Sequence, residues 1–174
     1  DEIFIELDPG MAFGTGHHPT TKMCILEIEK LFNAGIRDRV LDIGTGSGIL
    51  AMVAATLGAN SVLGIDTDPL AVTAALLNVK TNKLMNKVEI IQGTTESNNL
   101  SQYDLVVANL YSKVIMEIGH SIMSKMAGNG VVILSGIMKD KLEEVIVSLR
   151  THNFVLDHYL TEGDWAVAVG HKEE

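Results

Sequence analysis

Two hydrophobic patterns alternate along the chain. Short uninterrupted aliphatic runs are typical of strands buried on both faces of a parallel sheet. Longer segments in which apolar residues recur every three or four positions predict helices. The aliphatic runs predict strands over 39–43, 61–66, 88–92, 104–109, 131–135, 153–160 and 165–170, with a further short strand near 3–7.

Helix signals fill the gaps between these runs. Thr20 is a suitable N-cap, Pro69 suits the first turn of a helix, and Gly58 and Gly128 stand where helices should end. The pattern predicts helices over 20–34, 47–57, 69–82, 112–126 and 139–149.

The order of these elements predicts the fold class. Five strands alternate with helices, which indicates a doubly wound parallel sheet of the α/β class. The last two strands, joined by 161–164, form a hairpin and add an antiparallel strand. We therefore expect a seven-stranded, Rossmann-like sheet that is mostly parallel and closes with a C-terminal antiparallel hairpin.

Composition fits one domain with an aliphatic core. The chain has 174 residues, 47% hydrophobic and 5% aromatic, with no internal repeat. Its one cysteine excludes a disulfide framework and suits a reducing cytoplasm. No apolar run approaches membrane-spanning length. We expect residues 1–174 to form a single domain, and we expect a fragment, because Asp1-Glu2-Ile3-Phe4 is no natural start.

The net charge of −9 bears on possible partners. An acidic surface argues against binding driven by the phosphates of DNA or RNA. It is compatible with a basic protein partner, because opposite fields steer encounter. A merely soluble acidic protein would have the same charge, so charge alone does not select a function.

A glycine-rich turn carries the strongest functional signal. Gly44, Gly46 and Gly48 follow the strand at 39–43, and Asp66 ends the next strand. A glycine turn followed by such an acid is how an open parallel sheet holds a nucleoside, the acid accepting hydrogen bonds from the ribose hydroxyls.

The glycine spacing favours S-adenosylmethionine (SAM) over a dinucleotide. The dinucleotide fingerprint G-x-G-x-x-G would need a third glycine where this chain has Ile49. The observed G-x-G-x-G spacing is similar to the first motif of SAM methyltransferases. The closing hairpin is also typical of the seven-stranded methyltransferase fold and unlike an NAD domain.

Polar residues at the carboxyl ends of the predicted strands are the candidate ligands. The ends of the first four strands supply Asp42, Gly44, Gly46, Asp66, Thr94 and Asn109. Asn109 stands where amino-methyltransferases often carry an N-P-P-Y-type motif that holds the nitrogen nucleophile. The run here is Asn109-Leu110-Tyr111-Ser112, without either proline, which weakens assignment to a glutamine or adenine N-methyltransferase.

The loop at 13–21 is the second distinctive feature. Its glycines and hydroxyls suit either a linker with a helix cap or a lid over the cofactor, and we favour the lid. Phe13, Gly14 and Thr15 are therefore candidate cofactor-binding residues. Adjacent His17 and His18 do not point the same way and lack further ligands at metal spacing, so we expect no metal.

The motifs together resemble the ribosomal protein L11 methyltransferase family. They are D-P-G-M-A-F-G-T-G-H-H-P-T-T at 8–21, L-D-I-G-T-G-S-G at 41–48, V-A-N-L at 107–110 and E-G-D-W at 162–165. The resemblance covers essentially the whole chain. It implies SAM-binding residues at Thr21, Gly44, Asp66 and Asn109, and a cytoplasmic enzyme. The resemblance further implies a small N-terminal domain that recognises L11, and we expect residues 1–174 to lack it.

The resemblance also implies a reaction. The substrate would be ribosomal protein L11, methylated on lysine side chains and its N-terminal amine, with no direct role for nucleic acid or membrane. Asn109 would accept a hydrogen bond from the neutral amine. Three alternatives stay open: a SAM methyltransferase for another protein or a small molecule, an NAD(P)-dependent oxidoreductase, and a non-catalytic SAM-binding module.

Overall fold

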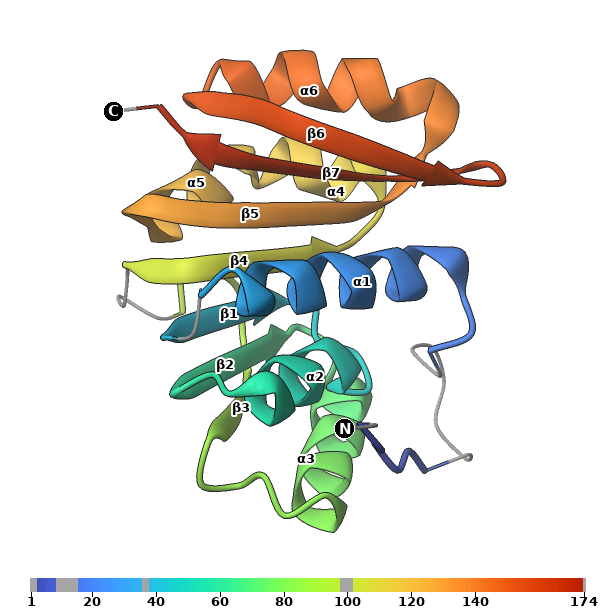
Figure 1. The fold of residues 1–174 in the computed structure, drawn as a ribbon, viewed down its shortest axis with the longest axis vertical. Helices are drawn as coiled ribbons and strands as arrows, with labels where there is room; N and C mark the ends of the chain where they lie inside the picture. The colour runs from blue at the N-terminus through green and yellow to red at the C-terminus, as the bar shows by residue number, and fades with distance from the viewer. Residues whose placement is uncertain (1–2, 9–15, 36–37, 98–101, 174) are drawn as a thin grey trace.

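Seven strands form one sheet in the order β3-β2-β1-β4-β5-β7-β6 (Figure 1). The computed structural model describes residues 3–8, 16–35, 38–97 and 102–173. The strands are β1 Arg39–Ile43, β2 Ser61–Asp66, β3 Val88–Gln92, β4 Tyr103–Asn109, β5 Met126–Met138, β6 Phe154–Glu162 and β7 Trp165–Lys172. Strands β1 to β5 pair in parallel, while β7 lies antiparallel between β5 and β6. The predicted fold class is confirmed.

Helices cover both faces of the sheet. One face carries α1 Pro19–Asn33, α2 Ile49–Leu57 and α3 Pro69–Thr81, and the other carries α4 Ser112–Glu117, α5 Gly119–Lys125 and α6 Leu142–Arg150. In Figure 1, α1 and α2 lie in front of the sheet and α4 lies behind it. Each layer buries its own cluster of mainly aliphatic side chains against the strands. Burial of this apolar surface is the main force that holds the layers together.

The structure corrects several predicted element boundaries. Helix α1 begins at Pro19 with His18, not Thr20, as its N-cap, and the predicted helix over 139–149 starts with a 3-10 turn at Lys139–Lys141. Helix α2 begins at Ile49 because Gly48 before it is left-handed, with φ of 82°. The helix predicted over 112–126 divides into α4 and α5 at Ile118. Strand β5 runs from Met126, well before the predicted 131–135, because Gly128, Asn129 and Gly130 interrupt its hydrophobic pattern.

The prediction of a strand near residues 3–7 is also wrong. Residues 3–8 pair with no strand in the part of the chain that the structure describes. Their backbone instead bonds to side chains at the C-terminal end of α3, where Oδ1 of the C-cap residue Asn82 accepts from the Glu6 N–H at 2.9 Å. Ile5 and Leu7, two residues apart as on one face of a strand, do pack against the core.

Glu27 is a charged side chain within the layer formed by α1. It is 1% exposed and lies 2.6 Å from Lys30 Nζ and 2.9 Å from His158 Nε2 of β6. Burial alone would raise the pKa of this carboxyl. Hydrogen bonds from Lys30 and His158 outweigh burial and hold the pKa below its ordinary value.

The lowered Glu27 pKa gives a pH prediction. The unfolded state binds this proton more readily than the folded state, so the stabilisation is fully present above about pH 4.5 and is lost as the pH falls below it, through the lower pKa of the folded state. Glu27→Gln should destabilise the chain by about 1–2 kcal/mol at neutral pH, because bonds to a charged acceptor weaken.

Urea unfolding of parent and variant at about pH 7 and about pH 4 checks this prediction, because the gap between the two proteins should narrow in acid. A gap that stays constant or widens at low pH would contradict the assignment of the shift to Glu27. Glu29→Gln, on the exposed side of the same helix, is the matched control and should leave the unfolding free energy unchanged at both pH values.

Candidate active site

A cavity opens where the strand order reverses. Strands β1 and β4 are neighbours, and the chain continues from them to opposite sides of the sheet, which leaves a crevice at their carboxyl ends. The cavity there has a volume of about 870 Å³, within the usual range for small-molecule sites. Its lining combines apolar and polar residues: His18, Thr20, Thr21, Gly44, Thr45, Gly46, Ser47, Ile49, Leu50, Asp66, Asp68, Leu70, Ala71, Ala74, Asn109, Leu110, Tyr111, Val114, Gly136 and Trp165.

The glycine loop after β1 forms one wall of this cavity. The N–H groups of Gly44 and Thr45 donate to the Ile65 carbonyl at 2.8 and 3.0 Å, which ties the loop to β2. Gly44 has φ of 71°, and a Cβ there would collide with the Leu110 side chain. Glycine is required at this position both for its backbone conformation and for the close approach of Leu110.

The Asp66 carboxylate faces the same cavity from the end of β2. Its Oδ2 accepts from the Gly46 N–H at 2.9 Å, and its Oδ1 accepts from the Asp68 N–H at 3.0 Å. A carboxylate has about four lone-pair positions, so each oxygen can accept another hydrogen bond. The arrangement fits a ligand that presents two adjacent hydroxyls, as a ribose does.

Asn109 and Thr21 form the opposite wall. Asn109 ends β4, Thr21 lies in the first turn of α1, and Asn109 Nδ2 donates to Thr21 Oγ1 at 3.4 Å. A bond of this length is weak, so the amide can exchange it for a ligand contact. The cavity thus brings together five of the sequence-predicted site residues: Thr21, Gly44, Gly46, Asp66 and Asn109.

Asp42 and Thr94 lie outside the cavity lining. Asp42 is 2% exposed and accepts from Thr45 Oγ1 at 2.6 Å, beneath the glycine loop. Burial raises the pKa of Asp42 to about 6, against the lowering effect of the Thr45 bond. Thr94 is exposed and donates its N–H to Ser97 Oγ at 2.9 Å. Their assignment to cofactor binding stays a prediction, as does that of Phe13, Gly14 and Thr15, which lie outside the described residues.

His18 and Trp165 are lining residues that the sequence analysis did not propose. Their rings meet edge to face, with centroids 4.8 Å apart, and His18 Nδ1 lies 2.8 Å from Thr20 Oγ1. Trp165 begins β7 and pairs with Met138 at the end of β5. The sequence predicted the hairpin but not that its second strand pairs with β5, and this pairing brings Trp165 to the edge of the sheet where β5 ends.

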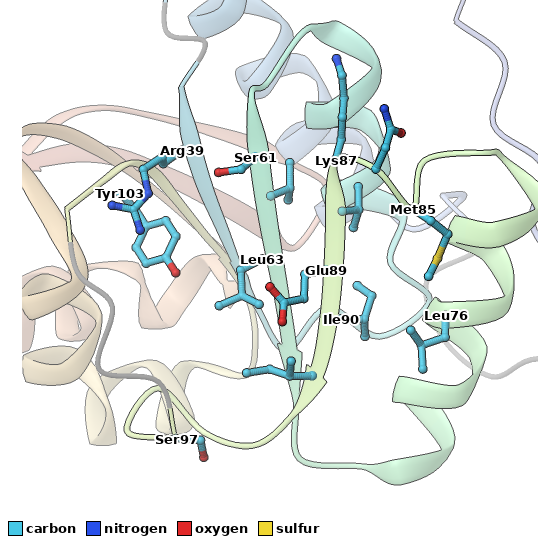
Figure 2. Close-up of a pocket in the computed structure, with 14 residues that line it drawn as sticks. Arg39, Ser61, Leu63, Leu76, Met85, Lys87, Glu89, Ile90, Ser97 and Tyr103 are labelled. Carbon is cyan, nitrogen blue, oxygen red and sulfur yellow. The ribbon is translucent and has the colours of Figure 1, made fainter.

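A second hollow, of about 790 Å³, lies beside the edge strand β3 (Figure 2). Arg39, Ser61 and Tyr103, at the starts of β1, β2 and β4, contribute to its lining. Figure 2 shows Arg39 beside Tyr103, and the guanidinium carbon is 4.9 Å from the ring centroid. The polar groups at this hollow come largely from strand starts, so it lacks the convergence of strand ends that defines the first cavity.

Within residues 3–8, 16–35, 38–97 and 102–173, no three His, Cys, Asp or Glu side chains are grouped to hold a metal ion. In the same ranges, no helix has the length and apolar character needed to cross a membrane.

The fold and the loop geometry define the class of the protein. The strand order with an antiparallel seventh strand is the SAM-dependent methyltransferase fold. A precorrin 8W decarboxylase structure from Methanobacterium thermoautotrophicum shares this fold with a TM-score of 0.75 at 19% identity. Residues 1–173 match the model of one family within this class, Ribosomal protein L11 methyltransferase (PrmA), and the chain belongs to that family.

Individual members of the family are similar to this chain over nearly its whole length. The ribosomal protein L11 methyltransferase of Anoxybacillus flavithermus is 44% identical over 173 residues, which cover 99% of this chain and 55% of the relative. That of Alkaliphilus oremlandii is 46% identical over 168 residues, covering 97% and 53%. The crystal structure of a ribosomal protein L11 methylase from Lactobacillus delbrueckii subsp. bulgaricus superposes with a TM-score of 0.88 at 33% identity, covering 98% of this chain and 86% of that one.

The chain spans about half the length of the curated relatives it matches. The resemblance found in the sequence is confirmed, and membership of this family does not support the oxidoreductase alternative. SAM dependence is a property of the family.

Proposed function

We propose that this chain is the catalytic domain of a SAM-dependent protein N-methyltransferase whose substrate is ribosomal protein L11. Lysine side chains and the N-terminal amine of L11 would be methylated. The observation that carries the proposal is the cavity at the ends of β1, β2 and β4, in a chain of the L11 methyltransferase family. Residues 1–174 would act as one domain, with L11 recognition shared by the rest of the longer protein, in the cytoplasm.

The residues of the cavity fit SAM. Asp66 would accept hydrogen bonds from the ribose hydroxyls, and the glycine loop would leave room for the amino-acid tail. Thr21 and Asn109 would contact the ligand from the opposite wall. Asp42 would act through Thr45, whose hydroxyl it holds at 2.6 Å, by fixing the glycine loop. Bound SAM supplies an electrophilic methyl group on a sulfonium.

The chain must orient and desolvate the attacking amine. Lysine has an ordinary pKa of about 10.4, so the amine must lose a proton before it can attack. The apolar side of the cavity, with Leu110, Val114 and Trp165, would lower that pKa by excluding water. Asn109 would accept a hydrogen bond from the neutral amine and so aim the lone pair of the amine nitrogen at the methyl carbon. Catalysis would then come chiefly from positioning.

Two measurements test the proposal. Calorimetric titration with SAM and, separately, with NAD should show binding of SAM alone. Incubation with SAM and purified L11 should then add methyl increments to the intact mass of L11. SAM binding without methylation of L11, even by the full-length protein, would indicate another substrate or a non-catalytic binding module. Absence of SAM binding would refute the proposal.

Asp66→Asn should raise the SAM dissociation constant about tenfold. The amide retains the shape of the side chain but loses one acceptor and the negative charge, and a charge-assisted hydrogen bond contributes roughly 1.5–3 kcal/mol. Calorimetry measures the change. Asp104→Asn, at the opposite end of the sheet where the carboxylate accepts from the Arg39 N–H at 2.8 Å, is the matched control. Equal affinities in the two variants would remove Asp66 from the ribose site.

A further inference from the structure

Two asparagines, Asn78 on α3 and Asn82 at the C-cap of that helix, hold the extended segment at residues 3–8. Asn82 bonds to both backbone groups of Glu6: its Oδ1 accepts from the N–H at 2.9 Å, and its Nδ2 donates to the carbonyl at 2.7 Å. Asn78 Oδ1 accepts from the Asp8 N–H at 3.0 Å. The two amides thus replace the neighbouring strand that an extended segment would otherwise pair with.

The spacing of the two asparagines matches the segment. Residues four apart on a helix lie on one face and rise about 6 Å along the axis. Residues two apart in an extended chain are separated by about 6.6 Å. Asn78 and Asn82 can therefore bind Glu6 and Asp8 in register, while Ile5 and Leu7 pack against the core.

Asn78 also reaches the glycine loop. Its Nδ2 donates to the Ser47 carbonyl at 2.9 Å, and the Asn78 side chain is 2% exposed. Ser47 lines the cavity, next to Gly46, whose N–H is held by Asp66. One buried amide thus joins the loop on one wall of the cavity to the segment at 3–8.

The residue type supports a role in positioning. Asparagine is a poor helix former, and a buried position facing the core is ordinarily filled by an apolar residue. A buried amide is retained where its donor and acceptor are both used. The segment that it binds precedes Gly16–Thr21 in the chain, where His18, Thr20 and Thr21 line the facing wall of the cavity.

We propose that Asn78 is a positioning residue that couples the N-terminal segment to the glycine loop and thereby sets the affinity for SAM. The inference rests on the proposed function, since it takes SAM as the ligand of the cavity. Residues 3–8 are not among the described residues that line the cavity, and Asn78 is the link through which we expect this segment to affect SAM binding.

Two substitutions break the link at different points. Asn78→Leu keeps the branched shape and the number of heavy atoms of the side chain and removes both bonds. Asp8→Pro removes the N–H that Asn78 accepts and leaves the bond to Ser47 intact. Asp8→Ala keeps the N–H and is the matched control for Asp8→Pro. Asn82→Leu removes the contacts to Glu6 at the C-cap of α3, one turn beyond Asn78, and it is the control for Asn78→Leu.

Calorimetric titration with SAM, at a temperature where thermal unfolding shows every variant folded, gives the readout. Asn78→Leu should raise the dissociation constant at least tenfold, and Asn82→Leu less than threefold. Asp8→Pro should raise it about threefold to fivefold over Asp8→Ala. In the Asn78→Leu background, Asp8→Pro should add nothing, because the bond that it breaks is already absent.

The outcomes separate the two proposals. A parent chain that fails to bind SAM refutes the proposed function, and this inference falls with it. A parent chain that binds SAM, with Asn78→Leu and Asp8→Pro each within twofold of its control, overturns the inference alone. The coupling is also overturned if only one of these two substitutions weakens SAM binding, or if their effects on the free energy of SAM binding add fully in the double variant. If Asn78→Leu does not fold, the comparison of Asp8→Pro with Asp8→Ala decides.

Discussion

Replacing Asn109 with alanine is expected to lower kcat for methyl transfer by roughly a hundredfold to a thousandfold, the usual cost of removing one preorganised polar contact. SAM affinity should change by less than about tenfold, because Asp66 and the glycine loop remain. The physical reason is that attack needs the amine neutral and aimed at the methyl carbon, and Asn109, at the end of β4, faces the cavity where that amine would lie.

Single-turnover methylation of L11, followed by intact mass, measures the loss for Asn109→Ala, and calorimetry with SAM measures affinity. Thr21→Val is the matched control, because it removes the hydroxyl that accepts from Asn109 Nδ2 at 3.4 Å but leaves the amide in place. Its effect on kcat should be much smaller. An equal loss of turnover and affinity in Asn109→Ala would instead assign the residue to cofactor binding only.

The sequence predicted the strands that position this site because their patterns are local. Consecutive aliphatic residues in 61–66 and 104–109 indicate strands buried on both faces, and a strand end is where polar side chains can face a ligand. Asp66 and Asn109 follow from that rule, and the structure brings both to one cavity. The class of fold followed from the order of elements and the closing hairpin.

Other features depend on tertiary contacts that no local pattern contains. Trp165 joins the site through the pairing of β7 with β5. The extended residues 3–8 alternate like a strand, but their hydrogen-bond partners are the side chains of Asn78 and Asn82. Asp42 is a residue type that often binds ligands, but it lies beneath the glycine loop, where its carboxylate accepts a hydrogen bond from Thr45.

Gly44→Ala should have the second large effect, on both stability and SAM binding. Its φ of 71° costs a non-glycine residue about 1–2 kcal/mol, and the added Cβ also collides with the adjacent Leu110 side chain. Since the Leu110 side chain and the glycine loop both line the cavity, relief of the collision would displace one or both of them within the site. We expect the SAM dissociation constant to rise at least a hundredfold.

The chain offers a control that separates the effect of the left-handed backbone conformation from the effect of the steric collision. Gly58 is also left-handed, with φ of 116°, but a Cβ there has nothing within 4 Å. Gly58→Ala should therefore lower the unfolding free energy by about 1 kcal/mol and leave SAM affinity unchanged. Adding Leu110→Ala to Gly44→Ala should recover part of the lost affinity by making room for the Cβ. Calorimetric affinities equal in Gly44→Ala and Gly58→Ala would show that the close approach of Leu110 to the loop plays no part in holding the cofactor.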